Sequence, residues 1–138
     1  MEYQAKLTRE GRQWLVEFPD CPGCQTYDSS RSAALSAARE ALEGWLEAHL
    51  VTGDAPPRPK RRRGLVGVSV SARLSVALAL RWYRLDEGLT VAQAARRAKV
   101  ATAEVRAIED PDEGVLLEST SYVFTRLGLQ VDVQLGAA

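Results

Sequence analysis

The chain has 138 residues, of which 46% are hydrophobic and 26% charged, with 18 Lys and Arg residues against 18 Asp and Glu residues. This composition is typical of one ordinary globular domain or two small ones, and it argues against a disordered chain. No apolar run approaches the ~18 residues that a bilayer crossing needs, the N-terminus lacks the pattern of a signal peptide, and two cysteines cannot form a disulfide framework. We therefore expect a soluble, cytoplasmic protein without a membrane partner.

The charges are unevenly distributed along the chain. Residues 1–57 carry 5 basic and 9 acidic side chains, whereas residues 58–138 carry 13 basic and 9 acidic ones. Much of the basic excess comes from one short run, which consists of Arg58, Lys60, Arg61, Arg62 and Arg63. Two interpretations of this run are open: contact with a DNA backbone, or a flexible, soluble linker.

The first 70 residues show the pattern of a small α+β domain. Apolar and polar residues alternate over residues 3–7 and 14–18, which predicts two half-buried strands, and a short third strand follows over 24–27. Ser30 is a good helix N-cap, and the apolar residues after it recur at helical spacing. Alternating valines over 66–70 predict a further strand. The predicted order is β-β-β-α-β.

A segment rich in proline and arginine interrupts this domain. Residues 52–64 contain three prolines and two glycines beside the basic run. Such a composition cannot bury a core of its own and is typical of a connector. We therefore divide the chain into a first domain over 1–51 plus 65–70, a connector over 52–64, and a second domain over 71–138.

The second domain is predicted to be helical. A first helix reaches from about residue 77 to the region of Gly88, a good residue for closing a helix. Thr90 is expected to cap a second helix over 91–99, and Thr102 a third that ends before Pro111. A fourth helix runs over about 117–127 and is closed by Gly128.

The C-terminal tail alternates between apolar and polar residues and predicts a strand without a local partner. An amphipathic strand at a chain end often pairs with its copy in a dimer, because unpaired backbone groups are costly to bury. We therefore expect this tail to dimerise the chain. Its apolar residues are Leu129, Val131, Val133 and Leu135.

Residues 90–109 predict a helix-turn-helix, in which two short helices meet closely at the small residue Ala95. The second helix of such a pair enters the major groove of DNA. The alternative is any small helical bundle with short loops. On the helix-turn-helix interpretation, the residues that would contact phosphates are Thr90 and Gln93, and those that would face base edges are Thr102, Ala103 and Arg106.

Residues 72–135 resemble a lambda-repressor-type (Xre-family) helix-turn-helix, through the Thr90 cap, Ala95 and the closing Ile108-Glu109 pair. The N-terminal part resembles the HicB antitoxin family, through the segment WLVEFPDCPGC at 14–24 and the helix that carries AREAL at 38–42 and Trp45-Leu46. This resemblance implies a partial ribonuclease-H-like domain that binds a HicA-type, mRNA-cleaving toxin. It also implies an all-α domain that binds operator DNA as a dimer.

The acidic residues of the first domain fit a basic protein partner, since complementary charge speeds encounter. The candidates for toxin contact are Glu17, Asp20 and Asp28, and the acids of this domain are expected to be solvated. They lack the clustering that two-metal nuclease chemistry requires. We therefore expect no enzymatic activity and no cofactor. The alternative function is a stand-alone regulator or scaffold whose first domain binds a small ligand or another protein.

Cys21 and Cys24 form a CxxC motif around a Pro-Gly turn. A structural zinc site needs four ligands, and the chain has neither a second CxxC nor any histidine besides His49. We interpret the two cysteines as turn residues with small buried thiols. A zinc ion shared between two copies of the chain is the alternative.

Overall fold

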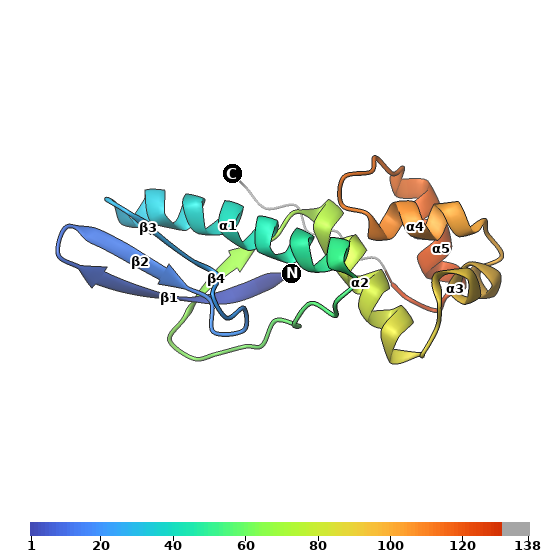
Figure 1. Ribbon diagram of the computed structural model, residues 1–138, viewed down its shortest axis with the longest axis horizontal. Helices are drawn as coiled ribbons and strands as arrows, with labels where there is room; N and C mark the ends of the chain where they lie inside the picture. The colour runs from blue at the N-terminus through green and yellow to red at the C-terminus, as the bar shows by residue number, and fades with distance from the viewer. Residues whose placement is uncertain (131–138) are drawn as a thin grey trace. The chain divides into compact units, whose positions relative to one another are not determined.

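The computed structural model describes residues 1–130, which form four strands and five helices (Figure 1). The chain divides into two compact units, with the boundary between Ser71 and Ala72. The first unit combines a sheet with one helix, so the predicted α+β class is confirmed. Within residues 1–130, no helix has both the length and the apolar character that a membrane crossing requires.

The sheet of the first unit has the strand order β3-β2-β1-β4, and every neighbouring pair is antiparallel. Its longest strand, β1, pairs through its second half with β2 and through its first half with β4. Gly11, at φ +62°, makes the turn from β1 to β2. The strands span Glu2–Glu10 (β1), Gln13–Glu17 (β2), Gln25–Asp28 (β3) and Val66–Ser69 (β4). These bounds confirm the alternation that the sequence predicts.

Helix α1, Arg31–Thr52, packs against β2, β3 and β4 and lies along the sheet (Figure 1). The Ser30 side chain accepts a hydrogen bond from the Ala33 amide at 3.1 Å, so the predicted N-cap is confirmed. The buried residues of α1 recur every four positions, which places them on one stripe of the helix. They are Ala34, Ala38, Leu42, Leu46 and Leu50.

The segment between α1 and β4 is bound to the sheet unit along its length. Pro56 is buried, and the Tyr3 hydroxyl donates to the Pro57 carbonyl at 2.7 Å. The Asp20 carboxylate accepts from the Lys60 amide at 3.0 Å and from the Arg62 guanidinium at 2.7 Å. Side chains from β1 and the β2–β3 loop therefore bind this segment, which argues against the flexible-linker interpretation.

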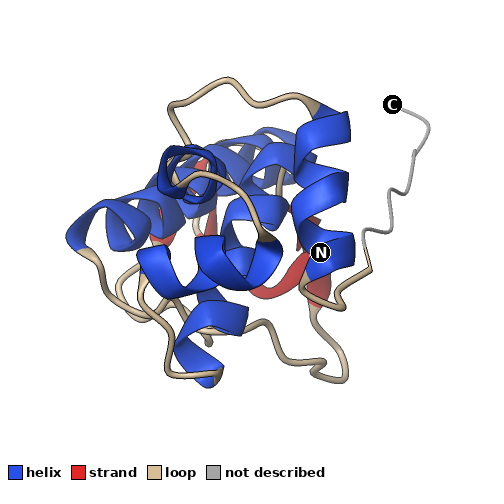
Figure 2. Ribbon diagram, turned by 90° about the vertical axis from the view of Figure 1, so that its right-hand side faces the viewer, coloured by secondary structure: helices blue, strands red, loops and turns tan. Residues whose placement is uncertain are grey.

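The second unit contains the helices α2 (Ala72–Asp86), α3 (Val91–Ala98), α4 (Thr102–Glu109) and α5 (Leu117–Arg126), which loops connect (Figure 2). Its core is made of small residues from α3 and larger ones from the other helices. The small side chains let α3 approach its neighbours closely, and the predicted small residue Ala95 is only 2% exposed. The core residues are Leu80, Ala94, Ala95, Ala98, Val105, Ile108, Val123, Phe124 and Leu127.

The helix ends of this unit follow the predicted signals with one exception. Gly88 and Gly128 have φ values of +65° and +75°, which glycine adopts without strain. Thr102 is the first residue of α4 and does not cap it, because the N-cap is Ala101, which makes no side-chain hydrogen bond. The predicted cap at Thr102 is therefore wrong by one position.

Of the four apolar residues of the predicted dimerisation tail, the structure describes only Leu129. Its amide donates to the Phe124 carbonyl at 2.8 Å, and its side chain packs, partly buried, against the helical core. Val131, Val133 and Leu135 lie outside the described residues.

Candidate functional site

Helices α3 and α4 are joined by a three-residue turn, and the first residue of this turn has a left-handed backbone conformation. Lys99, at φ +58°, is the single non-glycine residue with positive φ in residues 1–130. Its amide donates to the Arg96 carbonyl at 3.2 Å, and the Val100 amide donates to the Ala95 carbonyl at 3.0 Å. These bonds satisfy carbonyls that the end of α3 would otherwise leave unpaired. The two short helices are thus joined by a tight, hydrogen-bonded turn of three residues.

The N-terminus of α3 is closed by a capping box. The Gln93 amide donates to the Thr90 hydroxyl at 3.1 Å, and the Thr90 amide donates to the Gln93 side-chain oxygen at 2.8 Å. This pairing fixes the orientation of the Gln93 carboxamide and leaves its NH₂ group out of the box. Both predicted phosphate-contact residues are exposed, and they meet at the positive end of the α3 dipole.

Helix α4 buries one side and exposes the other. Val105 and Ile108 are 0% and 2% exposed. Thr102 is partly exposed, and Ala103 and Arg106 are exposed, so the three predicted base-reading residues occupy the solvent side of the first turns. At about 100° per residue, Thr102 and Arg106 point in nearly the same direction. The structure thus brings these residues together on one surface.

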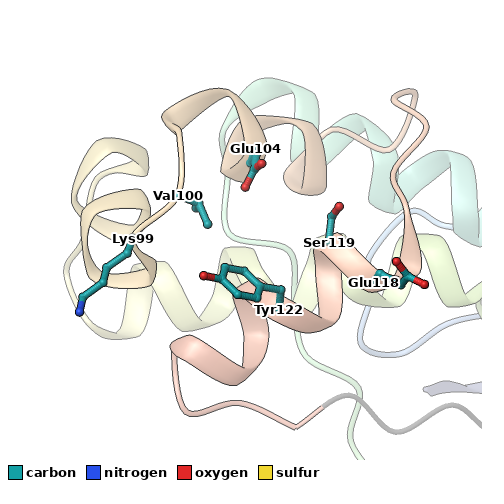
Figure 3. A pocket seen from close by; sticks show the side chains of 6 residues that line it. All are labelled: Lys99, Val100, Glu104, Glu118, Ser119 and Tyr122. Atoms are coloured by element: carbon teal, nitrogen blue, oxygen red, sulfur yellow. The ribbon is translucent and has the colours of Figure 1, made fainter.

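Glu104 leaves α4 on a different side and borders a shallow hollow between α4, the α3–α4 turn and α5 (Figure 3). Figure 3 shows Glu104, Ser119 and Tyr122 directed toward the hollow, whereas Lys99 points away from it. Helix geometry separates Glu104 from Arg106 by roughly 160° around α4. The carboxylate of Glu104 therefore does not share the face that Arg106 presents.

Two arginines of α2 hold the C-terminal end of α4 through the buried carboxylate of Glu109. Arg81 donates to Glu109 Oε1, and Arg84 donates to Oε2 at 2.8 Å and to Oε1 at 3.0 Å. The side chains are 9%, 13% and 5% exposed for Arg81, Arg84 and Glu109. Arg84 also donates to the Leu89 carbonyl at 3.0 Å, just before α3 begins. This cluster connects α2 to the end of α4 and to Leu89, which directly precedes the N-cap of α3.

A third arginine, Arg73, holds the carbonyl groups at the end of α4 and in the loop that follows. Its guanidinium donates to the Ala107 carbonyl at 2.7 Å, to the Ile108 carbonyl at 2.8 Å and to the Glu113 carbonyl at 3.1 Å, and also to that of Asp110. Burial lowers the pKa of Arg73, which Asp110 and Glu113 oppose by their negative charge. None of these three arginines was predicted from the sequence to hold α4, although Arg81 interrupts an otherwise apolar stripe of α2.

Near α3, the cations differ in how they are bound. Arg97 donates to the Tyr83 hydroxyl at 3.1 Å and lies 3.7 Å from a carboxylate oxygen of Glu87. Arg96, Lys99 and Arg106 are exposed. Exposed cations therefore lie on or beside α3 and α4, the two helices that the sequence predicts to contact DNA.

The three acidic candidates of the first unit do not form one cluster. Asp28 is half-buried and accepts from the Ser29 amide at 2.7 Å. Glu17 pairs in register with Lys6, on the sheet face opposite the buried side chains of Tyr3 and Ala5. Asp20 is 9% exposed, so the expectation that it is solvated is wrong; its carboxylate is held by the loop before β4.

Cys21 and Cys24 are both buried in the tight turn after β2, which confirms their interpretation as small buried thiols. The Cys24 amide donates to the Cys21 carbonyl at 2.9 Å. Burial, with the charges of Cys24 and Asp20, raises the pKa of Cys21 to about 12, and burial raises that of Cys24 to about 11. Across residues 1–130, no group of three or more His, Cys, Asp or Glu side chains is placed to hold a metal ion.

His49 is half-buried near the end of α1, where its ring contacts Trp45 of the same helix. Its Nδ1 donates to the Trp45 carbonyl at 2.9 Å, and the two ring centroids lie 3.9 Å apart. The imidazole is thus engaged within α1.

Comparison with known proteins assigns the chain to no family. No protein-family model matches it, and a search of curated proteins found no match.

Proposed function

We propose that this chain is an antitoxin of a HicAB-like toxin–antitoxin system. Its second unit represses the operon through the helix-turn-helix, and its first unit, as a partial ribonuclease-H-like domain, neutralises a HicA-like toxin by direct binding. The observation that carries the DNA-binding half is the anchoring of α4: its C-terminal end is fixed by Arg73 and Glu109, while its first turns face solvent. The protein acts in the cytoplasm, without catalysis or a cofactor of its own.

The DNA contacts follow from the exposed groups of α3 and α4. Arg106 is the best candidate for guanine, because a guanidinium donates in a fork to the N7 and O6 acceptors of that base. Thr102 and Ala103 precede it on the same exposed surface and would approach neighbouring base edges. The NH₂ group of Gln93 and the hydroxyl of Thr90 would position the chain on the phosphates.

We propose that the chain acts as a homodimer or a higher homo-oligomer. Pairing of two C-terminal tails would bring two recognition helices to two half-sites of one operator, as dimeric helix-turn-helix proteins require. The apolar residues proposed to pair are Leu129, Val131, Val133 and Leu135.

The toxin-binding half rests on the HicB resemblance and on the charge of the sheet. Strand alternation places Glu2, Lys6, Glu10 and Glu17 on the sheet face opposite the buried residues of β1, which gives that face three carboxylates and one ammonium group. Tyr27, 45% exposed, lies on the same face. An acidic surface with an exposed aromatic ring suits a basic protein partner. Of the three acidic candidates, Glu17 is the one on this face.

Replacing Arg106 by alanine is expected to weaken specific DNA binding by about 1–3 kcal/mol, because a bidentate base contact is lost. The measurement is fluorescence anisotropy with a duplex from the region upstream of the gene and a scrambled duplex, at one salt concentration. Binding to the scrambled duplex should change little. Arg12→Ala is the matched control, since Arg12 is exposed in the β1–β2 turn of the other unit. Unchanged preference for the upstream duplex in the Arg106 variant would show that α4 does not read the bases.

A pull-down of the tagged full chain from its own cells tests the toxin partner. We expect mass spectrometry to identify one small basic protein at equal stoichiometry, encoded beside this gene. The variant Glu17→Lys should recover less of it, whereas Glu40→Lys, on the exposed side of α1, should not. Recovery of DNA without a protein would instead favour a stand-alone regulator.

A further inference from the structure

The loop between α1 and β4 gathers cations on a path that the fold determines. Arg58, Lys60, Arg61 and Arg63 are exposed within six residues. A run of this composition is ordinarily mobile in solution. Here the buried Pro56 and the Tyr3–Pro57 hydrogen bond of 2.7 Å hold one end of the run.

Asp20 holds the other end through both of its carboxylate oxygens. Oδ2 accepts from the Lys60 amide at 3.0 Å, and Oδ1 accepts from the Arg62 guanidinium at 2.7 Å. The Asp20 side chain is 4% exposed, whereas that of Arg62 is 41% exposed. Burial raises the pKa of Asp20, but the Arg62 and Lys60 hydrogen bonds and charges outweigh it and leave the pKa below its ordinary value. The carboxylate is thus ionised at neutral pH.

The basic residues of this loop therefore have two different roles. Arg62 is neutralised by Asp20 and fixes the loop. Lys60, Arg61 and Arg63 flank that fixed point and face solvent. A loop already held in one path loses less conformational entropy when it binds a ligand than a free linker does.

We propose that residues 58–63 form a preformed phosphate-binding element of the first unit, that Asp20 is its positioning residue, and that its ligand is the backbone of duplex DNA. The proposal rests on the proposed function: the helix-turn-helix of the same chain brings DNA to this loop at high effective concentration. Several exposed cations within one short segment suit the closely spaced phosphates of a duplex, and their contact releases counterions.

The first test is the salt dependence of binding by the full chain to the upstream duplex. The double variant Arg61→Ala/Arg63→Ala should reduce the slope of log K against log salt by about 1.8 per protomer, since each phosphate contact contributes about 0.9. The control is Arg12→Ala/Arg31→Ala, which removes two exposed arginines of the same unit. We expect the control to keep the wild-type slope.

The second variant, Asp20→Asn, distinguishes the positioning of the loop by Asp20 from the effect of its negative charge on DNA binding. It removes a negative charge, so electrostatics alone predicts tighter binding to DNA. Loss of the Arg62 tether instead predicts weaker binding, by several-fold, with a lower salt slope. The surface double variant keeps the proposal testable even if Asp20→Asn fails to fold.

The outcomes distinguish this proposal from the proposed function. An unchanged slope in the double variant, with Arg106-dependent preference retained, would overturn the loop proposal alone. If wild-type protein binds no duplex DNA at low salt, the repressor function fails as well. Loop-dependent binding confined to single-stranded RNA of equal length would show that the ligand class is wrong.

Discussion

Replacement of Glu109 by alanine is expected to lower the free energy of unfolding by about 3–5 kcal/mol, because it leaves two buried guanidinium groups without their counter-charge. Both carboxylate oxygens of Glu109 accept hydrogen bonds, from Arg81 and from Arg84. Neither arginine can move readily into water, since their side chains are 9% and 13% exposed. Leaving these charges uncompensated thus lowers the free energy of unfolding much more than the loss of a surface ion pair does, which is worth about 0–1 kcal/mol.

Urea denaturation of the full chain, followed by far-UV circular dichroism, measures this effect. Glu104→Ala is the matched control, because Glu104 is an exposed carboxylate of the same helix, and its loss should change stability by no more than about 0.5 kcal/mol. Glu109→Gln should fall between the two, since it keeps the shape of the side chain and one acceptor oxygen. Equal stability of the Glu109→Ala and Glu104→Ala variants would show that the cluster does not hold α4.

The local parts of this fold were accessible from sequence. Strand alternation and helix signals depend on neighbours within four residues, so Ser30, Thr90, Gly88 and Gly128 mark the ends of helices correctly. The same locality places Thr102, Ala103 and Arg106 on one exposed face of α4. The error at the start of α4 has a local cause too, since Ala101 takes the N-cap position although it has no side chain that can cap.

The long-range parts were not accessible, because they depend on charged pairs far apart in the chain. Asp20 meets Arg62 across 42 positions, and Arg81 meets Glu109 across 28. In a single sequence each of these residues looks like a solvated charge. One signal was present at Arg81, which lies four residues after the buried Ala77 on α2. A charge on an apolar helix stripe requires a buried partner, although the pattern does not say which residue it is.

The proposed toxin-binding surface could not be located from charge alone. The acidic balance of residues 1–57 is a property of composition, whereas the strand register decides which acids share a face. Glu17 lies on the acidic face of the sheet, Asp28 pairs in register with Trp14, and Asp20 is enclosed by the loop. The strand register therefore distinguishes Glu17 from Asp28, and the contacts of the loop before β4 distinguish it from Asp20.

Replacement of Arg73 by alanine is expected to lower the free energy of unfolding by about 2–4 kcal/mol, because hydrogen bonds to a charged donor are worth about 1.5–3 kcal/mol each and do not add fully. The carbonyls that Arg73 binds lie in the last turn of α4, where they lack amide partners within the helix, and in the loop that follows. They belong to Ala107, Ile108, Asp110 and Glu113. Loss of this arginine should therefore loosen the end of α4 first.

The variant Arg73→Lys distinguishes the contribution of the forked guanidinium geometry from that of the positive charge. A lysine keeps the positive charge, but its single nitrogen cannot reach carbonyls that the planar guanidinium binds together. We therefore expect it to recover less than half of the lost stability in urea denaturation, and the backbone amides of residues 108–110, 112 and 113 to exchange faster in both variants. Arg96→Ala, an exposed arginine of α3, should leave both measurements unchanged. Full recovery by lysine would mean that positive charge at the helix C-terminus, and not the forked geometry of the guanidinium, holds α4 in place.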